Sequence, residues 1–191
     1  MAEPWWTRVV RVPPQPIQPM EQPKQPLTTG QKATGLAAII GTVAAGVLYV
    51  SIPEDEGTRY KAYRDIAGIW TICIGDTANV RPGMVETPEG CRVRLEAQLV
   101  NHAIPVMACT PRLAEPGRDY QRAAAVSLAY NIGVGAYCRS SVDRNFDAGN
   151  WRAGCDAFLA WNKARVNGVL RPVLGLTRRR ERERAICLRG L

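Results

Sequence analysis

Glu56, Asp65 and Thr71 place two carboxyl groups and a hydroxyl close together in the chain, with eight residues between the first two and five between the last two. Hydrolysis of a glycosidic bond needs one carboxyl group to protonate the leaving oxygen and a second group to activate water or stabilise the positive sugar ring. These residues can supply both functions if Glu56 ends a helix and Asp65 faces it from a following hairpin. Taken alone, such a pair is more often an ordinary set of surface charges.

The residues around this trio make the pattern more specific. The run EGTRYKAYRDIAGIWTICIG resembles the phage-type lysozymes of glycoside hydrolase family 24, and so do SLAYNIGVGAYCRSSVDRNFDAG and the stretch from Trp161 to Arg179. The resemblance extends from about Glu54 to the end of the chain. It implies an α+β, mainly helical, lysozyme-like domain over residues 53–191, with a small β-hairpin subdomain.

The resemblance assigns a role to each member of the trio. Glu56 would be the general acid, Asp65 the ionised partner that stabilises the oxocarbenium charge, and Thr71 the residue that holds the water, with inversion at the anomeric carbon. The bond cut would be the β-1,4 bond between N-acetylmuramic acid and N-acetylglucosamine in peptidoglycan, without metal or organic cofactor. The residues implied in substrate binding are Asn131, Gly133 and Ser140.

One position departs from the family pattern. After the second strand the family has Gly followed by His, whereas Gly75 is followed here by Asp76. An acid cannot donate as an imidazole does in a salt bridge. We therefore expect changed local packing and pH dependence, with activity retained.

Two other functions stay open. A lytic transglycosylase also uses a catalytic acid but closes the muramic ring without water, and the presence of Asp65 and Thr71 argues against it. A membrane-tethered peptidoglycan-binding protein with an inactive lysozyme fold would be indicated by loss of either acid, and both are present.

The net charge and the histidine content limit which other functions the sequence allows. The 25 basic and 17 acidic residues give a net charge of +8, which favours an anionic partner. Nucleic acid is not predicted, because the densest basic run, 178–184, contains two glutamates and reads as a solvated helix face. His102 is the one histidine, too few for a typical zinc peptidase, and we predict no catalytic role for it.

The six cysteines predict disulfides in an oxidising compartment. None forms a Cys-x-x-Cys pair, and fifteen pairings are open. Buried reduced thiols are the alternative. The disulfide candidates are Cys73, Cys91, Cys109, Cys138, Cys155 and Cys187.

The amino-terminal part divides into a tail and an apolar segment. Residues 1–32 are rich in proline and are predicted to be a disordered, extended tail, with Trp5 and Trp6 near its start. Residues 33–52 are uncharged, and twenty helical residues span about 30 Å, the hydrocarbon thickness of a bilayer. A buried core helix, or a helix-pairing surface through Ala37, Gly41 and Ala45, is the alternative.

This arrangement resembles the signal-anchor-release endolysins of phages. The resemblance implies a monomer anchored in the host inner membrane by residues 33–52, with a cytoplasmic amino terminus and a periplasmic catalytic domain, later released to the periplasm to cause host lysis. Because Glu56 lies four residues beyond Ile52, an inserted anchor would hold it at the membrane interface. We therefore expect the anchored form to be inactive.

The remaining pattern predicts short strands followed by helices. Alternating β-branched, aromatic and glycine residues between 63 and 75 predict two or three strands. Thr177 is the expected cap of the last helix. Helices are predicted over residues 88–107, 120–131, 140–147, 151–161 and 176–188.

Overall fold

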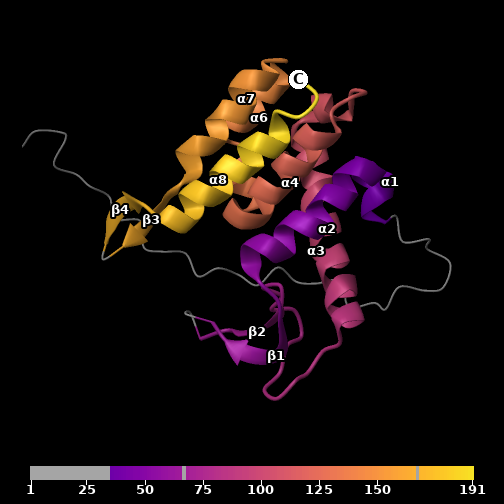
Figure 1. The fold of residues 1–191 in the computed structure, drawn as a ribbon, viewed down its shortest axis with the longest axis vertical. Helices are drawn as coiled ribbons and strands as arrows, with labels where there is room; N and C mark the ends of the chain where they lie inside the picture. The colour runs from indigo at the N-terminus through magenta and orange to yellow at the C-terminus, as the bar shows by residue number, and fades with distance from the viewer. Residues whose placement is uncertain (1–34, 66–67, 167) are drawn as a thin grey trace, which may run out of the picture. The chain divides into compact units, whose positions relative to one another are not determined.

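The computed structural model describes residues 35–65, 68–166 and 168–191. The predicted tail, with Trp5 and Trp6, and the first two residues of the apolar segment lie outside this range. The described part is mainly helical, as predicted, and has two small β-hairpins (Figure 1). Its helices are α1 (Leu36–Ile40), α2 (Thr42–Glu56), α3 (Pro88–Cys109), η2 (Pro111–Ala114), α4 (Asp119–Ile132), α5 (Val134–Tyr137), α6 (Ser141–Asp147), α7 (Trp151–Ala157), η3 (Phe158–Trp161) and α8 (Leu174–Cys187).

Helix α4 lies at the centre of the helical part. It packs against α2, α3, α5 and α8, and residues 123–129 are all buried. A helix that is apolar and small around its whole circumference can be surrounded by others, because alanine lets neighbouring backbones approach closely. Figure 1 shows α4 with α8 on one side and α2 and α3 on the other.

Helix α3 begins and packs as its sequence predicts. Thr87 caps it by accepting a 2.9 Å hydrogen bond from the backbone N–H of Gly90, and Pro88 takes the first turn, where no N–H is needed. Its buried residues recur every three or four positions and form one stripe. They are Cys91, Leu95, Leu99, Ala103 and Val106.

The apolar segment predicted as one membrane helix forms two helices in the structure. Gly41 separates α1 from α2 with a φ of 91°, a conformation that favours glycine. Among the described residues, no helix has the length and apolar character needed to cross a bilayer. In this packed form the segment contributes to the protein core, and its membrane role stays a prediction. Its fully buried side chains are Leu36, Ile40, Ala44, Leu48 and Ile52.

The first hairpin contains the second strand within the predicted range 63–75, but its first strand begins earlier than predicted, at Arg59. Strand β1 (Arg59–Arg64) pairs with β2 (Trp70–Cys73) in antiparallel register, with Tyr63 opposite Thr71. Isolated bridges join Lys61 to Val85 and Ile72 to Asp76, so the following loop is tied to the same small sheet.

The second hairpin was not predicted. Strand β3 (Lys163–Val166) pairs with β4 (Val169–Pro172), and α8 follows directly. Helix α8 therefore begins at Leu174, and the predicted cap at Thr177 is wrong. The Thr177 hydroxyl lies inside the first turn and donates to the Val173 carbonyl at 3.1 Å.

Candidate active site

Glu56 is the last residue of α2, where the helical part meets the first hairpin. Gly57 ends the helix with a φ of 71°, and β1 begins two residues later. The Glu56 side chain keeps 31% of its surface exposed. The sequence thus places a partly solvated carboxyl group at the junction of two substructures.

Arg179 of α8 holds this carboxyl group. Its Nη1 donates to Glu56 Oε1, and its Nε donates to Glu183 Oε1 at 3.2 Å. The Arg179 side chain is only 6% exposed. One planar guanidinium therefore contacts two carboxyl groups at once, which fixes its orientation.

A second arginine extends the network toward α4. Arg180, fully buried, donates from Nη2 to Asn131 Oδ1 at 3.0 Å, and its Nε lies 2.9 Å from Glu183 Oε2. Ser127 Oγ also donates to Glu183, at 2.7 Å. The prediction that residues 178–184 form a solvated face is wrong for Arg179, Arg180 and Glu183, each of which is buried.

Glu183 is the shared acceptor of this network. Burial raises the pKa of its carboxyl group, and the two arginines and Ser127 oppose that shift. Because Glu183 accepts hydrogen bonds from both arginines, it holds Arg179 and Arg180 side by side. Arg179 is the partner of Glu56, and Arg180 is the partner of Asn131. Arg179 lies in a family-like stretch of the sequence, but no role at this site was predicted for it, since it lies 123 positions from Glu56.

Glu56 and Asn131 line the same cleft. Its volume is about 260 Å³, and its walls come from the end of α2, the loop after β2, α3 and α4. Polar side chains from different elements thus converge beside an exposed carboxyl group, as expected of a site that binds a polar ligand. The lining residues are Glu56, Ile74, Gly75, Gln98, His102, Tyr130 and Asn131.

Tyr130 connects the walls of this cleft. Its hydroxyl oxygen lies 2.7 Å from the Ile74 carbonyl oxygen and 2.6 Å from Gln98 Oε1. Burial raises the pKa of the Tyr130 phenol, and the negative charges of Glu56 and Asp76 act in the same direction. Tyr130 is therefore a neutral hydrogen-bonding group that joins α4 to α3 and to the first hairpin.

His102 lies in the cleft, which composition alone could not indicate. Its Nδ1 is 2.7 Å from the Gln98 carbonyl oxygen one turn earlier, and its ring centroid is 5.1 Å from that of Tyr130. The contact with a carbonyl identifies Nδ1 as the protonated nitrogen. No role in catalysis was predicted for His102, and that prediction stays untested.

Asp65 and Thr71 are organised around Ile69 in the first hairpin. Asp65 Oδ1 accepts from the Ile69 N–H at 2.8 Å, and Thr71 Oγ1 donates to the Ile69 carbonyl at 3.1 Å. Thr71 is 3% exposed. The structure brings these two residues together, but neither lines the cleft that contains Glu56. Their approach to Glu56 stays a prediction.

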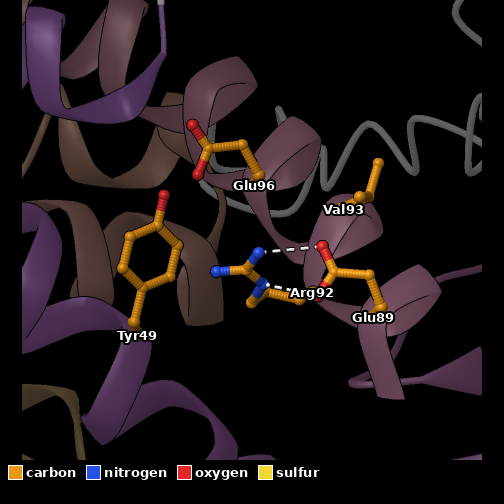
Figure 2. Close-up of a pocket in the computed structure, with 5 residues that line it drawn as sticks. All are labelled: Tyr49, Glu89, Arg92, Val93 and Glu96. Carbon is orange, nitrogen blue, oxygen red and sulfur yellow. Dashed lines mark hydrogen bonds and ion pairs between the residues drawn. The ribbon is translucent and has the colours of Figure 1, made fainter. Parts of the chain in front are cut away.

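A separate hollow of about 240 Å³ lies between α2 and α3 and shares no lining residue with the Glu56 cleft. Figure 2 shows Arg92 paired with Glu89, with Tyr49 and Glu96 nearby. Glu96 also accepts the backbone N–H of Leu36 at 2.8 Å. This contact joins the start of α1 to α3.

Comparison with known proteins decides the family. The model of the phage lysozyme family matches residues 53–183, more than half of the chain. The chain belongs to the phage lysozyme family. It is therefore a glycosidase, and the resemblance inferred from the sequence is confirmed.

Individual relatives cover most of this phage lysozyme. The SAR-endolysin of Enterobacteria phage P21 is 32% identical over 165 residues, which are 84% of this chain and 96% of the relative. The endolysin from Escherichia coli O157:H7 phage FAHEc1 has a TM-score of 0.68 at 30% identity and covers 80% of this chain and 94% of its own. The active form of P1 phage endolysin Lyz has a TM-score of 0.63 at 28% identity, covering 81% and 94%.

Asp76, where the family pattern has His, is a buried member of an ion pair. Its Oδ2 lies 2.5 Å from Arg94 Nη1, and its Oδ1 accepts from the Ala78 N–H at 2.9 Å. Arg94 also pairs with Glu86 at 3.1 Å and donates to the Ala78 carbonyl at 3.1 Å. In this phage lysozyme, Asp76 on the loop after β2 therefore forms an ion pair with Arg94 on α3. The expected effect on pH dependence stays a prediction.

The predicted substrate-binding residues occupy different environments. Asn131 lines the cleft, whereas Gly133 ends α4 with a φ of 86°. Ser140 is 3% exposed and caps α6 by accepting the Asp143 N–H at 3.1 Å. The capping contact gives Ser140 a structural role, and the substrate role of all three residues stays a prediction.

All six cysteines form disulfides, as predicted. The pairs are Cys73–Cys91, Cys109–Cys138 and Cys155–Cys187, each joining neighbours in the cysteine order. The first joins β2, the strand that contains Thr71, to α3 and so fixes the first hairpin on the helical part.

Proposed function

We propose that this phage lysozyme is an endolysin that hydrolyses the β-1,4 bond between N-acetylmuramic acid and N-acetylglucosamine in peptidoglycan, with Glu56 as its general acid. One observation carries the proposal. Glu56 is a carboxyl group held by a buried arginine at the edge of a polar cleft between the first hairpin and the helices. The names of the relatives as endolysins support the same function.

The chemistry needs a proton at the leaving oxygen and water at the opposite face of the sugar. Glu56 gives its proton to the glycosidic oxygen as that bond to the anomeric carbon breaks. A sugar chain that fills the cleft displaces water from around the Glu56 carboxyl group. Arg179 then acts by orienting the group.

Asp65 and Thr71 supply the second half of the reaction. The Asp65 carboxylate stabilises the positive ring and takes the proton of the attacking water, and the Thr71 hydroxyl orients that water. Both lie at one hairpin, with their polar atoms arranged around Ile69. Their approach to a sugar bound at Glu56 is part of this proposal, because neither residue lines the cleft in the structure.

We also propose that residues 33–52 first anchor the enzyme in the host inner membrane, with the amino terminus cytoplasmic. Several relatives are named SAR-endolysins, which supports this localisation. Helices α1 and α2 as packed here would belong to the released, periplasmic form, because their apolar side chains fill the protein core. Withdrawal of these helices into a bilayer would remove that core packing, and the anchored form would be inactive. The released enzyme acts as a monomer without a cofactor.

Product analysis tests the enzymatic proposal. The full chain is required, since residues 36–52 contribute to the core. Purified peptidoglycan is digested with the oxidised protein, and the fragments are analysed by mass spectrometry. Reducing muramic ends that disappear with Glu56→Gln, but persist with Glu54→Gln on the same helix, are the expected result. Anhydromuramic ends would establish a transglycosylase, and a folded protein without products would indicate a binding protein.

A further inference from the structure

The second hairpin presents apolar and basic side chains to solvent together. All four residues of β4 are exposed. Val169 and Leu170 are 51% and 59% exposed, and Leu174, at the start of α8, is 66% exposed. In the described part of the chain, β3 and β4 form a two-stranded sheet of their own. Such a ribbon has little stability by itself, so a surface that covers it would stabilise it.

The charged residues of the second hairpin and of the sequence around it are all basic. No Asp or Glu occurs from residue 157 to residue 180. Lys163, Arg165 and Arg171 of the hairpin are all exposed, and Arg165 Nη1 donates to the Gly168 carbonyl at 3.0 Å, which places its guanidinium near the turn. The hairpin thus combines cations with exposed Val and Leu side chains over about ten residues.

We propose that this hairpin docks on the surface of an anionic phospholipid bilayer. Basic side chains are attracted to anionic head groups, and adjacent apolar side chains gain free energy by entering the boundary between head groups and acyl chains. Peptidoglycan carboxylates would satisfy the cations equally well. They would leave Val169, Leu170 and Leu174 in water, so the apolar side chains decide in favour of lipid.

The base of the hairpin is firmly attached to the enzyme. The Val173 N–H donates to the Asn162 carbonyl at 2.9 Å, and Asn162 Nδ2 donates to Thr177 Oγ1 at 3.2 Å. Figure 1 shows the hairpin at the amino-terminal end of α8. Arg179 lies five residues beyond Leu174, or about 7.5 Å along the helix axis. A docked hairpin would therefore hold the Glu56 cleft close to the bilayer.

A label at the hairpin tests this directly. The full-length, oxidised protein carrying Leu170→Cys is labelled with an environment-sensitive nitrobenzoxadiazole group. Its fluorescence is followed on addition of phosphatidylglycerol or phosphatidylcholine vesicles. We expect a rise with phosphatidylglycerol that brominated acyl chains quench. The matched site is Ile104→Cys on α3, which is 55% exposed in the wild type and should give no such signal. Because each label reports its own surroundings, binding by the amino-terminal segment does not imitate the result.

Charge removal gives a second measurement. The double variant Arg165→Gln/Arg171→Gln should raise the phosphatidylglycerol concentration for half-maximal signal at residue 170 by about 30-fold, roughly fivefold for each cation. Arg81→Gln/Arg152→Gln, at two exposed arginines elsewhere, should leave it unchanged. Peptidoglycan hydrolysis should be the same for both. No signal at residue 170, an equal signal at residue 104, or a selective loss of peptidoglycan hydrolysis without a change in vesicle binding would overturn the proposal. The last result would identify the hairpin as a substrate surface.

Discussion

Arg179 and Glu56 form an ion pair that joins the last helix of the protein to the end of α2. Arg179 is buried, while Glu56 is partly exposed, so the arginine fixes the side chain that reaches the cleft. The same guanidinium is fixed in turn by Glu183. The position of the proposed general acid therefore depends on a helix that contributes none of the residues that line the cleft.

Arg179→Lys should lower kcat by about 100-fold, because an ammonium cannot hold Glu56 and Glu183 in the fixed geometry of a guanidinium, and a misplacement of about 1 Å costs that much. Initial rates of peptidoglycan hydrolysis over a range of pH give the measurement. Arg178→Lys, at the exposed neighbour, is the control. Wild-type kcat in the Arg179 variant would exclude a positioning role.

Gly41→Ala should destabilise the packed arrangement of α1 and α2. A backbone with φ of 91° and ψ of 155° is essentially restricted to glycine, and a Cβ atom there would lie 3.0 Å from Asp119 Oδ1. The expected cost is about 1–3 kcal/mol, measured as a lower free energy of unfolding.

Gly46→Ala is the matched change, since a Cβ atom at Gly46 meets nothing within 4 Å. Both alanines favour a straight helix, but only the one at position 41 strains the packed form. We expect more membrane-retained protein and slower lysis with Gly41→Ala than with Gly46→Ala. Equal behaviour of the two variants would show that backbone strain at position 41 does not affect release from the membrane.

Glu86→Gln should lower the melting temperature at neutral pH and have less effect in acid. The backbone N–H of Thr87 and the guanidinium of Arg94 hold the pKa of Glu86 below its usual value. A lowered pKa in the folded state stabilises the protein above the unfolded value of about 4.3, and this contribution is lost as pH falls through the folded value. Melting curves at pH 7 and pH 3 check this. The prediction is refuted if the difference in melting temperature between wild type and Glu86→Gln is the same at both pH values. It is also refuted if the exposed Glu181→Gln gives the same pH-dependent difference.

Removing the Cys73–Cys91 disulfide should reduce activity more than removing Cys155–Cys187. Each double Cys→Ser change is expected to cost about 2–4 kcal/mol of stability. The first also frees the hairpin that carries Thr71 from α3, whereas the second joins α7 to α8. Assays at a temperature where both variants are folded by circular dichroism separate the two effects. Equal rates would show that the hairpin needs no disulfide to hold its position.

Helix α3 and the first hairpin could be predicted because residues near one another in the sequence determine them. Thr87 and Pro88 mark the start of α3, and alternating residues mark the first hairpin. The second hairpin also had a signal, because Asn167 and Gly168 stand between two valines, a pair typical of tight hairpin turns. Its mixture of basic and apolar residues lacks a buried face, so the alternation that usually reveals a strand is weak.

The candidate site was only partly predictable. Glu56 and Asn131 were identified from motifs, and both line the cleft. The contribution of α8 was hidden, because Arg179, Arg180 and Glu183 stand at core-facing spacing in a run that otherwise looks like a solvated surface. Charged residues face the interior here because they pair with one another across the helices, and no local pattern reveals such partners.

The disulfides divide the chain into three successive loops that do not overlap, with sequence separations of 18, 29 and 32 residues. In the proposed topology, the part of the chain after residue 52 enters the oxidising compartment in sequence order, so both partners of one bridge arrive before the first cysteine of the next. Each bond can therefore close in the order in which the cysteines arrive. Oxidation can keep pace with translocation, and the enzyme can complete its cross-links with little need for thiol exchange catalysts.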